Sequence, residues 1–501
     1  MDELGQNQNI QEVKSMDTVD LFFAGFLILC LISFGAYLFT VLPNRDYTSN
    51  VVFFTIGIIG IWRYSWLILN IIRAFYYKKY AFFKYLNKTQ PTFVSDLRII
   101  ITTYGQKTEE IITVYKNLFV SIDNLNCQSI VVAAVKDDHQ IGLINALRIS
   151  VNSKSKIIFL KQKGIGKRDA LADIIKELRR YPLSENSYTV VMDGDVIVTP
   201  FAIERSLAVL SKNEKIFAVT ANEIPIVSGS KIFKIWRQLR SAQRDVLMSS
   251  FSLSRRVLVL TGRFSVYKSD KILTVATQAR MRQDVVFLRE YGMLPLLTGD
   301  DKTFWLEILR QNGEMVYIPD AYTFPLEFLA EDKNFVSGTW ALMARYNGNM
   351  VRANSAFWNE ISLKQPFHFI YGLLDQRLSA WSGLLAPMLL IILFFTAGFE
   401  PAIFLLLYII FVKNIQAFFI WRITGFYHPL SWALIAYNQI SGSILKVIAF
   451  SYPHKQKWNN QKISINIGEE EMRLSLIGLR KLVLYSSSFF IFLFVLTRLD
   501  T

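Results

Sequence analysis

Cysteine and histidine are scarce in this chain, which has two cysteines and four histidines among its 501 residues. Cys30 and Cys127 are too few for a disulfide framework, and no CxxC pair is present to bind zinc. The histidines are scattered, which argues against a histidine-ligated metal centre. The sequence also has no internal repeat and no low-complexity linker, so repeat architectures are excluded.

Acidic residues are fewer than basic ones, with 40 Asp and Glu against 55 Lys and Arg, and the net charge is +15. Such an excess can indicate a nucleic-acid-binding protein. Here the basic residues flank long apolar segments, so attraction to anionic lipid explains them more simply and we expect no nucleic-acid partner. Hydrophobic residues make up 52% of the chain, and their long runs near the two ends are typical of a membrane protein.

Two apolar runs near the N-terminus, residues 19–42 and 51–72, are each long enough to cross a bilayer as a helix. The flank before the first run is acidic and a second run follows at once, which argues against a cleavable signal peptide. Arg73 and the lysines after it place the next segment in the cytoplasm by the positive-inside rule. The N-terminal tail is then cytoplasmic too.

Apolar character returns after residue 345. We expect interfacial helices and spans in alternation, with interfacial helices at residues 367–381 and 429–452 and spans at residues 384–397, 402–424 and 482–496. Residues 429–452 are assigned to the interface because a span there would place the basic loop behind it outside the cell. The prediction is five spans with the C-terminus outside, and three domains: residues 1–94, a cytoplasmic domain at 95–352, and a membrane region at 353–501.

The middle of the chain alternates short β-branched runs with helical patterns. Strands are predicted at residues 98–103, 129–135, 156–160 and 188–192, and a helix at residues 108–120. This alternation predicts an α/β domain in which helices cover a parallel sheet. Ligands bind such sheets at the carboxyl ends of the strands, so functional side chains should follow each strand.

The strongest motif is Asp193-Gly194-Asp195, which directly follows the last predicted strand. Both carboxylates can reach one hard cation, and that cation can neutralise the diphosphate of a nucleotide sugar. A solvated turn at the end of a strand is the alternative. The position of the motif behind a hydrophobic strand favours a metal site, for Mg²⁺ or Mn²⁺.

A second acidic pair, Asp300-Asp301, follows about a hundred residues later in the string Leu297-Thr298-Gly299-Asp300-Asp301-Lys302. A carboxylate at such a loop-to-helix junction suits a general base that takes the proton from an attacking hydroxyl. Aspartate is also common as a helix N-cap for purely local reasons. Both interpretations can hold together, with one aspartate capping the helix and the other acting as base.

Two weaker motifs contain cations. Lys167 and Arg168 follow a glycine-rich turn, which can hold a diphosphate or can simply start a helix. Arg345 and Tyr346 lie where the middle domain returns toward the membrane. The aromatic ring beside the arginine can stack on a sugar, or the pair can belong to a basic and aromatic belt near the membrane.

In this order the motifs resemble those of the processive family 2 glycosyltransferases, which include the cellulose and hyaluronan synthases. The finer resemblance is to the alginate polymerases, or mannuronan synthases. It extends from the second span to the last cytoplasmic loop, in the strings GIWRYS (60–65), GKRD (166–169), DGD (193–195), AQR (242–244), LTGR (260–263), LTGDDK (297–302), DQR (375–377) and YNQI (437–440).

The resemblance implies a GT-A domain inserted between transmembrane helices and an inverting transfer from a nucleotide sugar with Mg²⁺. By position it implies metal binding by Asp193 and Asp195, and a base at Asp301 with Asp300 beside it. The remaining implied contacts are to the donor from Thr103, Tyr104, Asp137 or Asp138, Lys167, Arg168 and Asp193, and to the acceptor from Thr261, Gly262, Arg263, Arg345 and Tyr346. Tyr346 replaces the tryptophan of the family.

Trp458 lies in a loop, residues 454–465, that resembles the gating loop of the family, although the usual Phe-x-Val-Thr-x-Lys string is absent. The resemblance further implies a GDP-sugar donor (GDP-mannuronate), a β-1,4-linked polymannuronate product exported across the bacterial inner membrane, and a separate cyclic-di-GMP-binding PilZ co-polymerase subunit as partner. The alternatives are a synthase of another polysaccharide from a UDP-sugar, an enzyme that adds single sugars to a lipid, and a transporter with a regulatory domain. The two acidic motifs argue against the transporter.

Two cations fall inside predicted spans, Arg63 in the second and Lys413 in the fourth. Charges at that depth are costly and usually line a polar cavity. Snorkelling or pairing with a buried acid is the alternative for Arg63, although neither span offers an acidic partner. We therefore expect both side chains to face a common channel that suits an acidic polymer.

Overall fold

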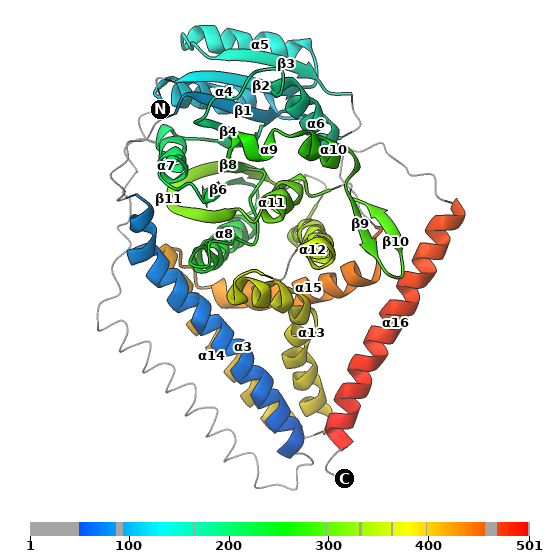
Figure 1. The fold of residues 1–501 in the computed structure, drawn as a ribbon. Helices are drawn as coiled ribbons and strands as arrows, with labels where there is room; N and C mark the ends of the chain where they lie inside the picture. Colours follow the sequence, from blue (N-terminus) through cyan, green and yellow to red (C-terminus); the bar gives the residue numbers. More distant parts are fainter. Residues whose placement is uncertain are drawn as a thin grey trace.

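The computed structural model describes residues 50–498 apart from gaps at 87–93, 126, 164–165, 297, 330–332, 362–363, 397 and 456–467. The span predicted at residues 19–42 and the loop that contains Trp458 lie outside the described residues. An α/β domain stands above a group of long helices that extend away from it (Figure 1).

The sheet begins as predicted. Strands β1 (Asp96–Thr102), β2 (Gln128–Val135), β3 (Lys156–Lys161) and β4 (Ser187–Asp193) are parallel, in the order β3-β2-β1-β4. Their carboxyl ends therefore meet at one edge of the sheet, with Thr102 beside Asp193.

The second half of the sheet is mixed, which corrects the prediction of a purely parallel sheet. Strand β8 (Phe264–Lys268) lies between β4 and β6 (Ile216–Glu223) and is antiparallel to both, and β11 (Glu314–Phe328) is parallel to β6. Short strands β5 (Val196–Ile197) and β7 (Ile226–Ser228) pair with β11, and β9 (Val285–Leu288) forms a separate hairpin with β10 (Gly292–Pro295). The strand alternation is a local pattern, and it carries no information about the direction in which β8 enters the sheet.

Helices cover both faces because alternate strand residues point to opposite sides. Ile100, Val132 and Val191 face a core shared with α6 (Lys167–Leu178), α8 (Lys231–Ser252), α10 (Val275–Gln283), α11 (Asp300–Arg310) and α12 (Phe335–Glu360). Val131 and Val190 face a second core with α4 (Thr108–Asp123), α5 (Asp138–Ser150) and α7 (Pro200–Ser211). A helix of four residues, α9 (Ser269–Ile272), follows β8.

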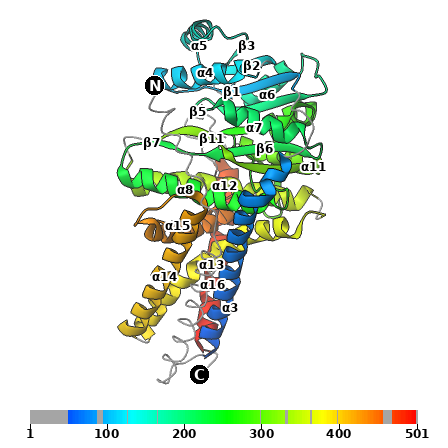
Figure 2. The same ribbon diagram turned by 90° about the vertical axis from the view of Figure 1, so that its left-hand side faces the viewer.

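Four long helices run away from this domain: α3 (Asn50–Tyr76), α13 (Phe367–Thr396), α14 (Phe399–Thr424) and α16 (Gly468–Arg498). By length and composition α13, α14, α15 (Ser431–Ser451) and most of α16 could each cross a membrane. In Figures 1 and 2, however, α15 runs across the base of the domain, beneath α8. That orientation favours the interfacial helix that the sequence predicts at residues 429–452, which stays a prediction.

The predicted interfacial helix at residues 367–381 and the span behind it form one continuous helix, α13, with Pro387 inside it. Helix α3 continues past the predicted span into two short irregular turns, at Tyr77–Ala81 and Phe82–Tyr85, that lead to the sheet. Tyr77 is fully buried and donates a hydrogen bond of 2.6 Å to the carbonyl of Tyr317. The membrane region and the α/β domain are thus joined by packed contacts as well as by the chain.

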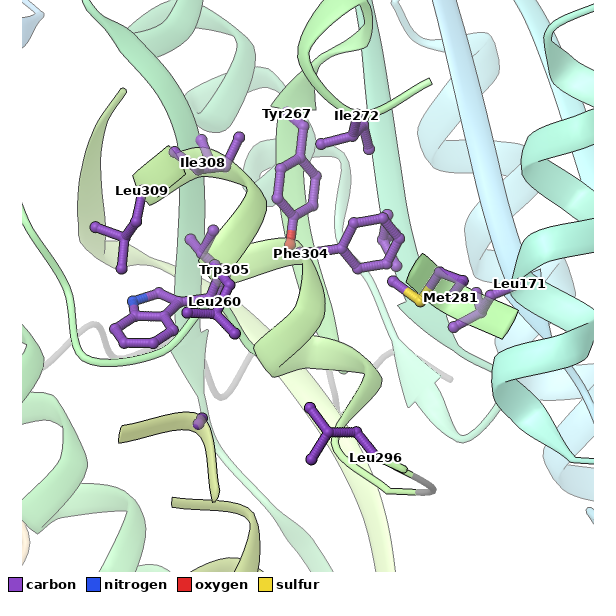
Figure 3. Packing of buried hydrophobic residues seen from close by; sticks show 14 of the residues in the cluster. Leu171, Leu260, Tyr267, Ile272, Met281, Leu296, Phe304, Trp305, Ile308 and Leu309 are labelled. Carbon is purple, nitrogen blue, oxygen red and sulfur yellow. The ribbon is translucent and has the colours of Figure 1, made fainter. Parts of the chain in front are cut away.

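Helix α11 is fixed by aromatic packing (Figure 3). The ring of Phe304 lies 5.4 Å from that of Tyr267 on β8, centroid to centroid. The indole N–H of the neighbouring Trp305 donates to the carbonyl of Val257 at 2.8 Å. Both side chains are about 1% exposed, so the N-terminal end of α11 is held at a defined place relative to the sheet.

This packing predicts that Phe304→Ala lowers the free energy of unfolding by about 3–5 kcal/mol, the usual cost of removing a buried aromatic ring. The matched control is Phe201→Ala, because Phe201 on α7 is 47% exposed. Its effect should stay within about 0.5 kcal/mol. Thermal unfolding of the purified variants in detergent measures both, and equal shifts for the two would contradict the assignment of this core.

Candidate active site

Gly194 allows the two aspartates of the Asp193-Gly194-Asp195 motif to sit against the end of β1. Its backbone N–H donates to the carbonyl of Thr102 at 2.9 Å. A Cβ at this position would lie 2.7 Å from both the Thr102 carbonyl oxygen and the Thr103 hydroxyl oxygen. Only glycine fits this close approach, so the motif needs glycine for steric reasons.

Lys167 connects the two acidic motifs. Its ammonium lies 2.6 Å from Asp193 Oδ1 and 2.7 Å from Asp300 Oδ2. Burial alone would lower the pKa of the Lys167 amine, but the two carboxylates outweigh it and raise that pKa above its usual value. The lysine therefore stays charged. The structure brings together Asp193, Asp195, Asp300 and Asp301, called the acidic cluster below.

The second acidic pair lies in the first turn of α11, and neither aspartate is the N-cap. The N-cap is Gly299, in a left-handed conformation with φ of 83°. The expectation that one aspartate caps the helix through its side chain is therefore wrong. Asp300 instead uses its carboxylate on Lys167, and both aspartates benefit from the positive end of the helix.

The two aspartates differ in basicity. Burial and the adjacent Asp300 charge raise the pKa of the Asp301 carboxyl to about 6. Burial also acts on Asp300, but Lys167 outweighs it and lowers the pKa of that carboxyl below its usual value. Asp301 is thus the more basic carboxylate of the pair, and its role as general base stays a prediction.

The acidic cluster fits a divalent cation. Among the described residues no group of three or more potential metal ligands occurs, so Asp193 and Asp195 would hold the ion as a pair. Two carboxylates suffice for Mg²⁺, which keeps several waters and takes further oxygens from substrate phosphates. Burial, together with the charges of Asp195 and Asp300, raises the pKa of the Asp193 carboxyl to about 6 against the opposing effect of Lys167. A bound cation would offset this excess of negative charge.

The residues predicted to contact the donor divide into those at or near the surface and those whose side chains are used inside the protein. Tyr104 follows β1 in the chain and is 40% exposed, so a ligand can reach its side chain. Asp137 caps α5 by accepting from the Gln140 backbone N–H at 3.0 Å, and Asp138 pairs with Lys161 at an exposed position. The choice between these two aspartates stays open.

Thr103 and Arg168 require correction, because their side chains are used inside the protein. Thr103 is fully buried and its hydroxyl bonds that of Tyr115 at 2.8 Å. Arg168 is 6% exposed and donates to Thr303 and to two backbone carbonyls at the end of α10. Its guanidinium lies 3.6 Å from Asp284. Arg168 ties α6 to α10 and α11, so its guanidinium is engaged in contacts inside the protein.

The segment predicted to bind the acceptor lies beside the acidic cluster. A Cβ on Gly262 would lie 3.3 Å from Asp300 Oδ2. The Thr261 hydroxyl is 3.2 Å from that of Thr220. The Arg263 guanidinium pairs with two buried glutamates, Glu223 at 2.9 Å and Glu327. An acceptor contact from Arg263 stays a prediction, while its pairing orders this wall of the site.

Sequence reasoning missed most of that wall. Arg237 on α8 pairs with Glu327, and Arg244, seven residues later on the same helix, lies 3.4 Å from Glu223. Arg237, Arg240 and Arg244 recur at spacings of three and four, which places them on one helix face. The arginines could therefore have been found from their spacing in the sequence. Their glutamate partners lie on distant strands and share no such pattern.

Tyr346 lies among these arginines. The Arg240 guanidinium is 5.6 Å from the centre of its ring. Burial raises the pKa of a phenol, but the charges of Arg237, Arg263, Arg345 and Arg240 outweigh it and lower the pKa of Tyr346 to about 7. Tyrosine in place of the family's tryptophan therefore adds a group that can balance positive charge.

Arg63 has a partly buried acidic partner, which corrects the expectation that it faces a channel unpaired. Its guanidinium pairs with Asp375 on α13, part of the Asp375-Gln376-Arg377 string. The partner was missed because it comes from neither of the two spans that carry the cations. Lys413 on α14 donates to Gln439 and Gln416. A channel role for Lys413 stays a prediction.

The geometry of the acidic motif predicts that Gly194→Ala lowers activity by about 10²-fold. The added methyl must displace the end of β1 or the two aspartates, and small misplacements of reacting groups have effects of this order. Gly142→Ala on α5 is the control, because a Cβ there meets no atom within 4 Å. Sugar transfer by the two purified variants is the measurement, and an active Gly194 variant would contradict the close approach.

Comparisons with known proteins show which family the chain resembles. Residues 96–356 match the family model "Glycosyltransferase like family 2". Two relatives share the name "Glycosyltransferase alg8". The one from Pseudomonas syringae pv. tomato is 27% identical over 88% of this chain and 91% of its own, and the one from Azotobacter vinelandii is 28% identical over 89% and 90%.

Among solved structures, the mannosyltransferase PcManGT of Pyrobaculum calidifontis, in complex with GDP-Man and Mn²⁺, has a similar fold. Its TM-score is 0.51 at 14% identity, over 78% of this chain and 97% of its own. At that identity the likeness concerns the fold alone. The matched family model covers more than half of the chain, and the two relatives, matched over most of their length, confirm the resemblance given by its motifs. The chain belongs to the family 2 glycosyltransferases and is a glycosyltransferase of the alginate-polymerase type.

Proposed function

We propose that this enzyme polymerises mannuronic acid from GDP-mannuronate into β-1,4-linked polymannuronate and passes the product to its membrane helices. The observation that carries the proposal is the acidic cluster, with Lys167 between Asp193 and Asp300 at the carboxyl ends of the strands. It combines a metal-binding pair with a separate base at one edge of the sheet, which is what an inverting sugar transfer requires.

In the proposed reaction, Asp301 accepts the proton of the acceptor hydroxyl as its oxygen attacks the anomeric carbon of the donor. The bond between that carbon and the diphosphate oxygen breaks, and the nucleoside diphosphate leaves with the electron pair. One displacement inverts the anomeric configuration. Asp301 suits this task because its raised pKa, about 6, makes it more basic than an ordinary carboxylate while it stays ionised at pH 7.

Asp193 and Asp195 would hold a divalent cation, which would neutralise the diphosphate charge that develops on departure. Lys167 holds Asp193 and Asp300 in place through its ammonium and is positioned to add positive charge near the same leaving group. Asp300 thereby acts as a positioning residue.

The donor and product are supported less directly. The relatives' shared name and the family motifs favour an alginate-type product. The mannosyltransferase PcManGT, which has a similar fold, is in complex with GDP-Man and Mn²⁺, which is compatible with a guanine nucleotide and a divalent metal here. We further propose the bacterial inner membrane as the location, with the α/β domain cytoplasmic, and a cyclic-di-GMP-binding PilZ protein as a separate co-polymerase.

Asp301→Asn should reduce transfer by about 10²–10⁴-fold, the usual contribution of one acid–base group, while leaving donor binding intact. Asp300→Asn, its neighbour, is the matched control and should be milder. In the parental enzyme the rate should fall as the pH drops through about 6, because the Asp301 carboxyl then takes up a proton and can accept no other. Incorporation of labelled sugar measures all three, and a greater loss in the Asp300 variant would move the base to that residue.

The donor is tested by nucleotide release and polymer formation with a panel of GDP- and UDP-sugars, in membranes with and without a PilZ partner. GDP-mannuronate should be turned over in preference to UDP-glucose, and EDTA should abolish the reaction until Mg²⁺ or Mn²⁺ is restored. Preference for a UDP-sugar would contradict the donor assignment and favour a cellulose- or hyaluronan-like synthase. Products of one added sugar would contradict processivity.

A further inference from the structure

The hairpin of β9 and β10 carries apolar side chains on both of its faces. Val286 and Leu294 are opposite each other in the register, and both are buried in the core that α11 and α12 share. The neighbouring pair, Phe287 and Met293, points to the other face, because alternate residues of a strand face opposite sides. These two side chains are 53% and 61% exposed, and Val285 on the same face is exposed too. Val285, Phe287 and Met293 are called the outer face of the hairpin below.

Hydrogen bonds hold this hairpin to the α/β domain. The Leu296 backbone N–H donates to the Asp284 carbonyl at 2.7 Å, and the Asp284 carboxylate accepts from the Thr303 hydroxyl on α11 at 2.8 Å. The Asn359 side-chain amide on α12 donates to the Phe287 carbonyl. A two-stranded hairpin is only marginally stable by itself, so these contacts are what fix its direction. The outer face is therefore exposed on a firmly held part of the fold.

The turn of the hairpin lies against two helices of the membrane region. Glu290 pairs with Lys481 on α16 at 3.1 Å, and the Lys481 ammonium lies 4.7 Å from the centre of the Tyr291 ring. The Tyr291 hydroxyl donates to the carbonyl of Ser451, the last residue of α15. Figure 1 shows the hairpin reaching down between α12 and α16. The turn thus touches both the helix expected in the interface and a helix that could cross the membrane.

Lys481 marks the level at which α16 would enter the membrane. Arg480 and Lys481 are the last charged residues before an uncharged, largely apolar run at residues 482–497, which contains the last predicted span. Charged side chains at the end of such a run lie at the boundary with water. Phe287 and Met293 are three residues to either side of Glu290. A strand rises about 3.3 Å per residue, so both lie within about 10 Å of this level.

An apolar outer face at this level fits lipid better than water. Three apolar side chains on one face of a short hairpin exceed the scattered exposure that is normal for a protein surface. Exposed arginines accompany them, Arg289 in the turn and Arg480 next to Lys481 on α16. Apolar side chains beside basic ones are typical of segments that lie in the membrane interface, where the basic groups attract anionic headgroups.

We propose that the outer face of the β9–β10 hairpin docks on the lipid surface of the membrane, with Phe287 and Met293 in the headgroup region and Arg289 on lipid phosphates. The hairpin is then an attachment of the α/β domain to the membrane in addition to the long helices. Because Asp284 at its base bonds to Thr303, the attachment also connects the membrane surface to the first turn of α11. The inference does not depend on which sugar the enzyme transfers.

The test measures the lipid contact of one labelled position in the full chain. Cys30 and Cys127 are replaced by serine, Met293→Cys carries the fluorescent dye NBD, and the protein is reconstituted in vesicles of phosphatidylcholine and phosphatidylglycerol. Lipids with a spin label just below the headgroup should quench about half of the NBD fluorescence or more, because interfacial segments sit about 5–10 Å into this boundary. The matched control is the same dye at Ile149→Cys, an exposed position on α5 at the end of the domain away from the long helices (Figure 1), where quenching should be negligible.

A second variant tests the outer face itself. Phe287→Asp in the protein labelled at position 293 puts a charge on this face and should remove most of the quenching. Quenching at position 293 no greater than at position 149, or unchanged by Phe287→Asp, would overturn the proposal. Blue-shifted emission without lipid quenching would overturn it too, because a protein surface, such as a second copy of the chain, then covers the face. Neither measurement involves sugar transfer, so failure to turn over GDP-mannuronate would contradict the proposed function alone.

Discussion

The contact between the Lys167 ammonium and the carboxylates of Asp193 and Asp300 is the interaction on which the rest of the site depends. Asp193 ends a strand, Lys167 starts the helix that directly precedes that strand, and Asp300 starts a helix about a hundred residues later. One charge thus holds three distant segments at one point. The Lys167 charge also makes the two neighbouring aspartates of α11 differ in basicity. It pairs with Asp300 and lowers the pKa of that carboxyl, whereas the pKa of the Asp301 carboxyl is raised.

The acceptor side follows a different electrostatic rule. There the arginines of α8 and Arg263 share two buried glutamates, Glu223 and Glu327. The arginines outweigh the burial of Glu223 and lower the pKa of its carboxyl to about 2, so it remains charged at any physiological pH. A wall of this kind is rigid, and it leaves a surplus of positive charge that reaches Tyr346. The side that carries Asp193 and Asp195 is thus rich in carboxylates, whereas the side that carries Arg263 and Tyr346 is rich in cations. This contrast would match the metal-bound diphosphate and the carboxylate-bearing acceptor proposed above.

Much of this arrangement could be predicted from the sequence where the signal is local. The four parallel strands, the Asp193-Gly194-Asp195 turn and the acidic start of α11 are all contiguous patterns, and the edge rule for parallel sheets was enough to place them together. The functions of Arg168, Thr103 and Arg63 could not be predicted in this way. An arginine beside a glycine-rich turn gives the same sequence pattern whether its guanidinium binds a ligand or contacts α10, as Arg168 does. The partner of Arg63 could not be found either, because Asp375 lies more than three hundred residues away in the sequence. The direction of β8 could not be predicted from a local pattern either, because it depends on where the chain re-enters the sheet.

The Arg63–Asp375 pair changes how the remaining charges of the helical region are understood. A cation in an apolar setting needs compensation, and the pair supplies it internally, so Arg63 joins α3 to α13 without any substrate. Lys413 and Lys446 sit close to this pair yet have hydroxyl and amide partners in the described structure. Asp375 also attracts the Lys446 ammonium electrostatically, so this one carboxylate offsets part of the charge of both Arg63 and Lys446.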